Sequence, residues 1–314
     1  MGWTAEKIPD QSGRVAVVTG GNGGLGLETS RELARNGAHV IIAARNLDKA
    51  AAAERDILES VPGASLEVRK LDLSSKASIK EFADGVLADH SKIDLLFNNA
   101  GVMATPESQT ADGFEMQFGT NHLGHFYLTR LLLPAVLRSG RGRVVATTST
   151  ARFSAGDYDL TNPHMRGEYQ PWVAYGYSKR ANLHFAIELN RRLAAAGAAV
   201  TAHAADPGFS KTDLQAASYR SSGGWTQRFW HVSVGWFGQS AARGALPQLR
   251  AGTDPSAVGG TLYRPKWVAR GAPAIGKIDE KLREPDELAT LWEVSEKETG
   301  TTFNVAALVG EAGT

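Results

Sequence analysis

Short apolar runs alternate with longer amphipathic stretches from Arg14 to about Thr212. The first such elements are an apolar run at Arg14–Thr19, a stretch of helical periodicity near Gly24–Asn36, and a second apolar run at Ala38–Ala43. A strand, a helix and a strand in this order are typical of a βαβ unit, in which the two strands are parallel. Similar runs predict further strands at Ser65–Leu71, Ile93–Phe97, Gly142–Thr148 and Ala198–Ala204.

These predicted strands are almost wholly apolar, which is the pattern of strands that helices cover on both faces. Helices between them are expected to begin near Leu47, Ser75, Ala111 and Val173. The alternation predicts an α/β fold with a doubly wound parallel sheet of the Rossmann type. Because no Pro/Gly/Ser-rich linker and no repeat of fixed length interrupts it, we expect a single domain over residues 1–314.

The character of the chain changes after Thr212. Residues 221–224 have a loop-like composition, and the next segment holds the aromatic residues Trp225, Phe229, Trp230, Trp236 and Phe237. We expect residues 213–238 to form a substrate lid on a core of residues 13–212, with core packing and a dimer contact as the alternatives for these aromatics. Residues 239–314 are expected to add a closing segment and helices near Gln239–Arg250 and Pro285–Thr299.

Composition and charge limit the class of protein and its partners. With 34 Lys and Arg against 33 Asp and Glu in 314 residues, the formal charge is +1, so we expect no nucleic-acid partner. Hydrophobic residues make up 42% of the chain, and the absence of Cys excludes disulfides, thiol nucleophiles and cysteine metal sites. No stretch reaches roughly 18 apolar residues, so we expect a cytoplasmic protein without a transmembrane anchor.

A glycine-rich loop follows the first predicted strand and precedes the first predicted helix. Its sequence, Thr19-Gly20-Gly21-Asn22-Gly23-Gly24-Leu25-Gly26, contains GxGxxG in one register and TGxxxGxG in another. Glycines at this point let backbone N–H groups approach a pyrophosphate at the helix N-terminus, so the loop predicts a dinucleotide site. The alternative is a tight turn without a ligand, which the flanking strand and helix disfavour.

The end of the second predicted strand bears on which dinucleotide binds. Sites for NAD place an acidic residue there, about 20 residues after the loop, to hold the ribose 2′-hydroxyl. This chain has Ala44, Arg45 and Asn46 instead. Ala44 leaves space and Arg45 supplies a cation that can pair with a 2′-phosphate, so we expect NADP(H) to be preferred over NAD(H). If Arg45 is only a solvated loop residue, the preference would be weak.

Tyr175 and Lys179 lie four residues apart in a predicted helix and therefore share one face. An ammonium beside a phenol favours the phenolate, which makes the tyrosine a usable acid or base. The spacing alone is common on helix surfaces. It gains weight from Ser149 and from residues 98–101, because both follow predicted strands, and the carboxyl ends of parallel strands face the ligand crevice.

Together these features resemble the short-chain dehydrogenase/reductase family, and within it the retinol dehydrogenase-like branch. The resemblance covers about Gly13 to Thr212 and rests on motifs in matching order: the TGxxxGxG loop, Asp72, Asn98-Asn99-Ala100-Gly101, Asn121, Ser149, Tyr175, Lys179, Pro207-Gly208 and Thr212. The branch is indicated by Ala44-Arg45-Asn46, Arg143-Val144-Val145, the long gap between Ser149 and Tyr175, and Ser178-Lys179-Arg180-Ala181-Asn182. Two departures are Thr147-Thr148 before Ser149 and Asp206, which stands where a His is common.

The resemblance implies a role for each matching residue. Tyr175 would be the general acid/base, Lys179 would lower its pKa and hold the nicotinamide ribose, and Ser149 would hydrogen-bond the substrate oxygen. Asn121 would complete a proton relay. The implied cofactor contacts, with Asp72 at the adenine, Asn99 at the adjoining ribose and Thr212 at the nicotinamide end, are Gly20, Asn22, Gly24, Leu25, Gly26, Arg45, Asn46, Asp72, Leu73, Asn99, Ala100, Gly101, Tyr175, Lys179, Pro207, Gly208 and Thr212.

The activity implied is that of an NADP(H)-dependent carbonyl reductase or alcohol dehydrogenase acting on a small molecule. The resemblance also implies a homodimer or homotetramer formed through the helices of Asn121 and Tyr175. Aromatic residues near Ser149 and in the expected lid predict a pocket for a bulky hydrophobic carbonyl or alcohol; they include Phe153, Tyr158, Tyr169, Trp172 and Tyr219.

Two other functions and a metal site are alternatives to this activity. A catalytically silent NADP(H)-binding sensor could use the same fold, but the intact Tyr175 and Lys179 argue against it. A methyltransferase would need an acid where Ala44 and Arg45 stand. His122 and His125 are candidate metal ligands without further ligands placed near them, so we expect no metal and assign both rings to packing and hydrogen bonding.

Overall fold

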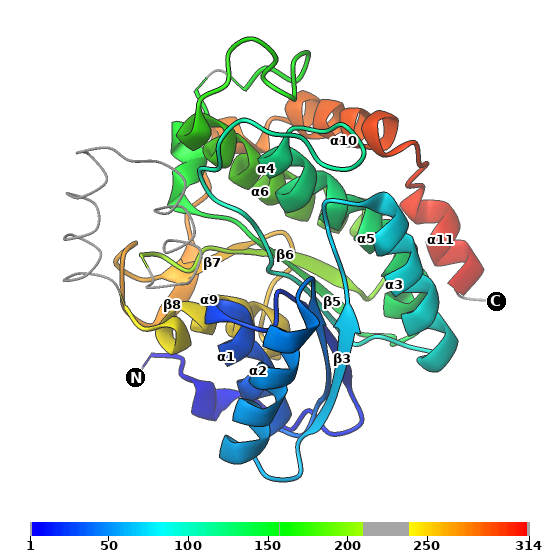
Figure 1. Ribbon diagram of the computed structural model, residues 1–314, viewed down its shortest axis with the longest axis vertical. Helices are drawn as coiled ribbons and strands as arrows, with labels where there is room; N and C mark the ends of the chain where they lie inside the picture. The colour runs from blue at the N-terminus through cyan, green and yellow to red at the C-terminus, as the bar shows by residue number, and fades with distance from the viewer. Residues whose placement is uncertain (1, 157, 210–238, 313–314) are drawn as a thin grey trace.

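Residues 2–156, 158–209 and 239–312 are described by the computed structural model (Figure 1). Eight strands form one sheet in the order β3-β2-β1-β4-β5-β6-β7-β8. All neighbouring strands are parallel except β7 and β8, which are antiparallel. The strands are β1 (Val15–Thr19), β2 (His39–Ala44), β3 (Ser65–Lys70), β4 (Leu95–Asn98), β5 (Arg143–Thr147), β6 (Thr201–Ala205), β7 (Leu262–Pro265) and β8 (Pro273–Gly276).

Helices cover both faces of this sheet, which is therefore doubly wound as predicted (Figure 1). One face carries α1 (Gly24–Arg35), α2 (Leu47–Ser60) and α9 (Ala241–Thr253). The other face carries α3 (Lys76–Asp89), α5 (Gly124–Leu137) and α6 (Pro171–Ala195), with α10 (Pro285–Thr299) and α11 (Val305–Ala312) packed outside them. Short 3₁₀ turns are η1 (Ala5–Lys7), η3 (Thr150–Ser154) and η4 (Glu280–Arg283).

Each face of the sheet has its own apolar core. Val17 and Ile41 belong to the core beneath α3, α5 and α6, whereas Val18 and Ile42 belong to the core beneath α1 and α9. Successive residues of a strand point to opposite faces, so a strand between two helical layers must be apolar at every position. This requirement is why the continuous apolar runs of the sequence predict the central strands correctly.

The two ends of the sheet differ from the prediction. The expectation that every strand is covered on both faces is wrong for β3, which is the edge strand and whose residues are all partly or fully exposed. Its sequence, Ser-Leu-Glu-Val-Arg-Lys, alternates as an edge strand with one solvated face does. β7 and β8 were not predicted, because runs of four residues containing Pro265 or Pro273 look like loops.

The helix expected near Ala111 begins later, at Met116. It consists of α4 (Met116–Phe118), a π-helical turn η2 (Gly119–Leu123) and then α5. Residues 110–113 form a turn instead, and an antiparallel bridge joins Gln109 to Glu115 beside it. The Glu115 carboxylate accepts hydrogen bonds from the N–H groups of Gln117 and Phe118, so this side chain caps the helix.

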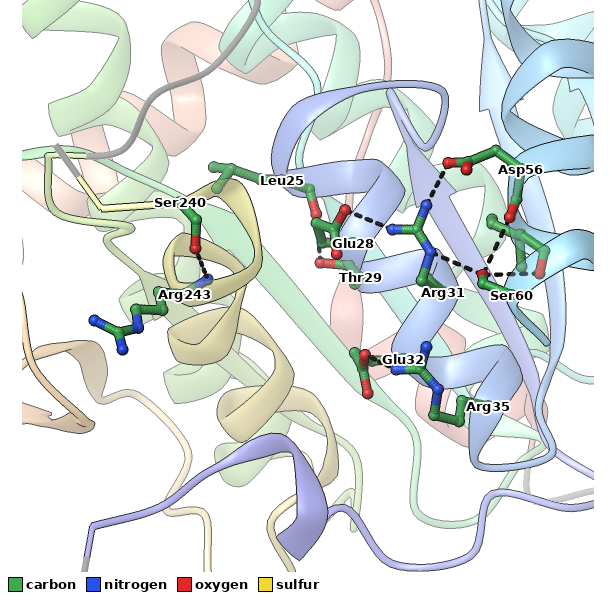
Figure 2. A network of polar contacts seen from close by, with 11 residues as sticks. Leu25, Glu28, Thr29, Arg31, Glu32, Arg35, Asp56, Ser60, Ser240 and Arg243 are labelled. Carbon is green, nitrogen blue, oxygen red and sulfur yellow. Dashed lines mark hydrogen bonds and ion pairs between the residues drawn. The ribbon is translucent and has the colours of Figure 1, made fainter. Parts of the chain in front are cut away.

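Figure 2 shows polar contacts within α1 and between α1 and α2. Arg31 points toward α2, where it pairs with Asp56 and hydrogen-bonds the Ser60 hydroxyl at 3.2 Å, and it also pairs with Glu28 on its own helix. On the opposite side, the Thr29 hydroxyl accepts a hydrogen bond from Gln248 of α9. These contacts hold α1 in one orientation, and therefore fix where its N-terminus points.

The segment expected to be a substrate lid, residues 213–238, lies outside the described residues, as does Thr212. Of the helices that the structure describes, none combines the length and the apolar character that crossing a bilayer requires.

Candidate active site

The four candidate catalytic residues meet beyond the carboxyl ends of β4, β5 and β6. Ser149 follows β5 and caps η3, its Oγ accepting a hydrogen bond from Ala151 N at 3.2 Å. Tyr175 and Lys179 lie in the first three turns of α6, with the lysine Nζ 5.7 Å from the centre of the tyrosine ring. Asn121 lies in the π-helical turn η2. The Asn121, Tyr175 and Lys179 side chains are buried, so the reacting groups are held in a water-poor environment.

Burial dominates the titration of Tyr175 and Lys179. It raises the pKa of Tyr175 well above the usual range, a hydrogen bond with Ser149 acts in the opposite direction, and the charge of Asp206 raises this pKa further. It lowers the pKa of Lys179 to about 8, and Asp206 opposes this shift. The Lys179 Nζ donates to Thr147 O at 3.1 Å. The hydrogen bond with Ser149 therefore favours the phenolate of Tyr175, and the same role for Lys179, implied by the resemblance, stays a prediction.

The Asn121 side chain holds the loop that follows β4. Its Oδ1 accepts from Val102 N at 2.7 Å, and its Nδ2 donates to Val102 O and to Ser178 Oγ, both at 2.9 Å. Gly101 lies against it, since a Cβ there would come within 2.9 Å of Asn121 Oδ1. Among the hydrogen bonds of the described residues, none joins Asn121 to Lys179. The amide therefore positions the loop, and the relay implied by the resemblance stays a prediction.

The glycine loop forms a cradle at the N-terminus of α1. Gly20 and Gly24 have φ values of +66° and +49°, a region that favours glycine. A Cβ on Gly26 would lie 2.1 Å from Gly20 O, so the loop closes tightly on itself. The N-cap residue Gly23 offers no side-chain hydrogen bond to the first turn. Uncapped N–H groups at a positive helix end, without intervening side chains, fit the pyrophosphate of a dinucleotide. Asn22 lies in the loop, and Leu25 lies in the first turn of α1.

Thr19 connects this loop to the Asn98-Asn99-Ala100-Gly101 turn. Its hydroxyl oxygen accepts from Asn99 N at 2.9 Å and from Ala100 N at 3.0 Å, while Asn99 Nδ2 donates to Thr19 O at 2.8 Å. His125 adds a third link: its Nε2 lies 2.9 Å from Thr19 Oγ1 and its Nδ1 lies 2.9 Å from Asn121 O. Burial lowers the pKa of His125 to about 4, so at neutral pH the uncharged ring donates to Asn121 O and accepts from Thr19.

Gln248 is a site residue that sequence reasoning missed. Its Oε1 accepts from Thr147 Oγ1 at 3.0 Å, and its Nε2 donates to Asn99 Oδ1 at 3.2 Å and to Thr29. The Gln248 side chain therefore connects α9 to the end of β5, to the residue that follows β4, and to α1. Its partners lie roughly 100 to 220 positions away, and no local motif marks it.

The residues expected near the adenosine ribose follow β2 and β3. Ala44 is the buried last residue of β2, and the next residue, Arg45, is exposed and makes no ion pair with any other described residue. Asn46 caps α2, since its Oδ1 accepts from Lys49 N at 2.9 Å. Asp72 follows β3 and accepts hydrogen bonds from Ser74, and Leu73 beside it is buried. Arg45 is thus a free surface cation next to a small residue, the arrangement that suits a 2′-phosphate.

Histidines elsewhere take part in packing and hydrogen bonds. The His122 ring is buried against Phe118, and its Nε2 lies 2.7 Å from Ser295 Oγ. Among the described residues, one group brings three side chains that can act as metal ligands within 4.8 Å of one another: His39, Glu67 and His90. Glu67 is already shared between His90, at 2.9 Å, and Arg69. This group lies toward the amino end of β2, away from the candidate active site.

The chain belongs to the short-chain dehydrogenase family, because the family model described as short chain dehydrogenase matches residues 14–222. It is 46% identical to mouse retinol dehydrogenase 12 over 207 residues, which cover 66% of this chain and 65% of that protein. The chain thus matches less than two thirds of the length of that relative. Mouse polyprenol dehydrogenase is 39% identical over 282 residues, covering 88% of this chain and 82% of that protein. These similarities place the chain in the retinol dehydrogenase-like branch.

Solved structures agree with this fold. The crystal structure of an uncharacterized protein from Mycobacterium paratuberculosis is 40% identical, with a TM-score of 0.79, and the match covers 96% of this chain and 99% of that one. A short chain dehydrogenase from Shigella flexneri, solved in complex with NADP, is 24% identical with a TM-score of 0.62 over 82% of this chain and 98% of that one. At this identity the second likeness supports the fold alone.

Proposed function

We propose that this protein transfers hydride between NADP(H) and the carbonyl or alcohol group of a bulky hydrophobic molecule, with Tyr175 as the acid/base. The observation that carries the proposal is the cluster of the buried Tyr175 and Lys179 with the partly buried Ser149, beside the glycine loop at the uncapped N-terminus of α1. Membership of an oxidoreductase family supports the same reaction. When bound, the nicotinamide supplies or accepts the hydride.

The side chains of this site have complementary tasks. Because burial keeps the Tyr175 phenol protonated at neutral pH, it can donate its proton to the oxygen of a carbonyl that is being reduced. Ser149, already hydrogen-bonded to Tyr175, can donate to the same oxygen and stabilise its developing charge. Lys179 places a cation beside the phenol and, with Asn99, lines the expected ribose sites. In the direction of oxidation, the hydrogen bond from Ser149 favours the phenolate that must accept the proton.

NADPH is expected to bind more tightly than NADH, because Arg45 can pair with the 2′-phosphate and Ala44 leaves space for it. Charge-assisted hydrogen bonds of about 1.5 to 3 kcal/mol correspond to a roughly ten- to more than hundred-fold difference in Kd. Titrating each cofactor into the protein while following its fluorescence measures the two values. Ala44→Asp should reverse the preference, because its carboxylate would repel the phosphate and accept from a ribose hydroxyl.

The matched control for this titration is Arg35→Ala, which removes a surface cation from the far end of α1. This variant should keep the wild-type ratio of the two Kd values. Equal Kd values for NADPH and NADH in the wild type would contradict the NADP preference. Tight NADPH binding with no turnover of any carbonyl or alcohol would instead indicate a cofactor-binding sensor.

The value of kcat/KM is expected to rise with the apolar size of the substrate, from short aldehydes to long-chain or isoprenoid ones. Phe153 and Trp172 are 64% and 48% exposed, and the Trp172 ring centre lies 6.2 Å from that of Tyr175. These rings offer apolar surface at the mouth of the site, where each buried CH₂ is worth about 0.8 kcal/mol. The similarity to a protein named polyprenol dehydrogenase supports a long apolar substrate.

A series of aldehydes of increasing length, assayed with NADPH, tests this gradient. Trp172→Ala, Trp230→Ala and Trp236→Ala should flatten it, whereas Val258→Ala, at an exposed site before β7, should not. A flat dependence in the wild type would contradict the proposed substrate class. Truncations that change the sedimentation profile but leave the gradient intact would assign the aromatic residues to an interface between copies.

A further inference from the structure

A buried ion pair lies beside the catalytic cluster, and the chemistry above does not use it. Arg152 Nη1 lies 2.6 Å from Asp206 Oδ2, and each side chain is only 1% exposed. Arg152 belongs to η3, three residues after Ser149, and Asp206 directly follows β6. The pair therefore spans the ends of two neighbouring strands at the carboxyl edge of the sheet.

The two side chains also bind the main chain on either side of the site. The same Arg152 Nη1 donates to Ser149 O at 2.7 Å. Asp206 Oδ1 accepts from Gly208 N at 2.9 Å, and Gly208 has a φ of +65°. The ion pair thus connects the turn that presents the Ser149 hydroxyl to the Pro207-Gly208 loop, where the nicotinamide end of the cofactor is expected.

The charge of Asp206 reaches the catalytic residues as well. It raises the pKa of both Lys179 and Tyr175. The titratable and charged groups around Lys179 are Tyr175 on its own helix, His125 from α5, and Asp206 after β6 with its partner Arg152. His125 is neutral above about pH 4, so Asp206 is the group in this set that favours the ammonium form of Lys179.

Packing alone does not account for this pair. Desolvating two charges costs enough that apolar residues of similar volume are often at least as stabilising as a buried ion pair. In addition, Arg152 Nε is buried and has no hydrogen-bond partner among the described residues. A pair that leaves one polar atom unsatisfied, yet bridges two functional loops, is better explained by the geometry it imposes on the site.

We propose that Arg152 and Asp206 are positioning residues for hydride transfer: they hold the Ser149 turn and the Gly208 loop in one fixed arrangement and keep a negative charge beside Lys179. This inference rests on the proposed function, because it assigns the pair to the reaction at the same site. It gives one residue from η3 and one from the end of β6 a positioning role, in which each acts through another group.

The test compares Arg152→Met, Asp206→Asn and the double variant by Tm, NADPH Kd, kcat and KM. Each single change leaves one buried charge unpaired, so both Tm and kcat should fall, kcat by tenfold or more. The double variant removes both charges, so Tm should return to within a few degrees of the wild type while kcat stays about tenfold low or lower. A double variant with both Tm and kcat at wild-type values would reduce the pair to a packing feature and overturn the proposal.

The matched control is Arg180→Met, which breaks the ion pair between Arg180 and Glu287 on the same helix as Tyr175. This pair joins α6 to α10 rather than the strand ends, so kcat should stay within about twofold of the wild type. A tenfold loss of kcat in this variant would show that breaking any ion pair near α6 is enough to lower kcat. That result would also overturn the proposal.

The pH profile of kcat/KM separates the charge of Asp206 from its hydrogen bonds. Asp206→Asn removes the charge that favours protonated Lys179, so the alkaline limb should move to lower pH, while Asp206→Glu should leave it near the wild-type position. An alkaline limb that does not move in Asp206→Asn would overturn the electrostatic part of the proposal.

The proposed function and this inference can fail separately. If the wild type transfers no hydride to any carbonyl, the proposed function is wrong, and the Kd for NADPH then tests the positioning role of Arg152 and Asp206. A threefold or greater loss of affinity in the double variant at wild-type Tm supports positioning of the Gly208 loop, and an unchanged Kd overturns it.

Discussion

Replacing Tyr175 with phenylalanine is expected to lower kcat by about 10²- to 10⁴-fold while the Kd for NADPH stays near the wild-type value. The change removes the phenolic proton and the hydrogen bond with Ser149 but keeps the ring, which is buried and lies edge-on to Trp172. Steady-state kinetics with a long-chain aldehyde and fluorescence titration of the cofactor measure the two effects separately.

Tyr177→Phe is the matched control for this variant. Tyr177 lies two residues further along α6, is also buried, and donates its hydroxyl proton to Asp159 O at 2.9 Å, away from the catalytic cluster. Losing this hydrogen bond should cost about 1 kcal/mol of stability and leave kcat unchanged. Full activity in Tyr175→Phe, or an equal loss in both variants, would mean that Tyr175 is a packing residue.

Gly26→Ala is expected to weaken NADPH binding by about 100-fold or more and to lower Tm. The added Cβ would lie 2.1 Å from Gly20 O and 2.7 Å from Asn99 Nδ2, so the backbone of the loop must move away from α1. A helix N-terminus binds an anion through several aligned N–H groups, and moving the loop disrupts most of them together. Fluorescence titration and thermal unfolding measure the two effects.

The control for this substitution is Gly310→Ala in α11, where the added Cβ would meet no atom within 4 Å. Alanine also has the higher helix propensity, so Tm should stay the same or rise slightly. A Gly26→Ala variant with wild-type Tm and wild-type NADPH affinity would contradict the tight loop described for Gly20 and Gly26.

The central strands could be predicted from the sequence because a strand buried on both faces is a continuous apolar run, and such a run can be recognised within a few residues. Val15–Thr19 and Leu95–Asn98 must be apolar at nearly every position, so they can be recognised without knowing their partners. The start of the helix that carries Asn121 could not be predicted in this way. It depends on the Glu115 cap and on a bridge to Gln109, and both are contacts that periodicity does not encode.

In the candidate site, too, some residues are marked by a local sequence motif and others depend on contacts that form only in the folded chain. Ser149, Tyr175 and Lys179 are marked by motifs at the end of a strand or along one helix, so their chain positions are enough to bring them together. Arg152 and Gln248 carry no such mark, because each acts through partners that only the folded chain brings near. From the sequence, Asp206 was only a departure from the family pattern, and its charge gains a meaning once Arg152, 54 positions earlier, lies against it.

Because of the π-helical turn at Gly119–Leu123, the contacts of the continuous helix α4–η2–α5 depend on its number of residues as well as on their identity. A π turn accommodates one more residue than an α-helical turn. With it, Gly119 packs against Thr110 and Phe114 while the Asn121 side chain still reaches Val102. Deleting one residue here would restore ordinary α-helical spacing and rotate one end of the helix by about 100° against the other, so the two contacts could not both be kept. The turn therefore acts as a fixed spacer between the packing of this helix and the loop after β4.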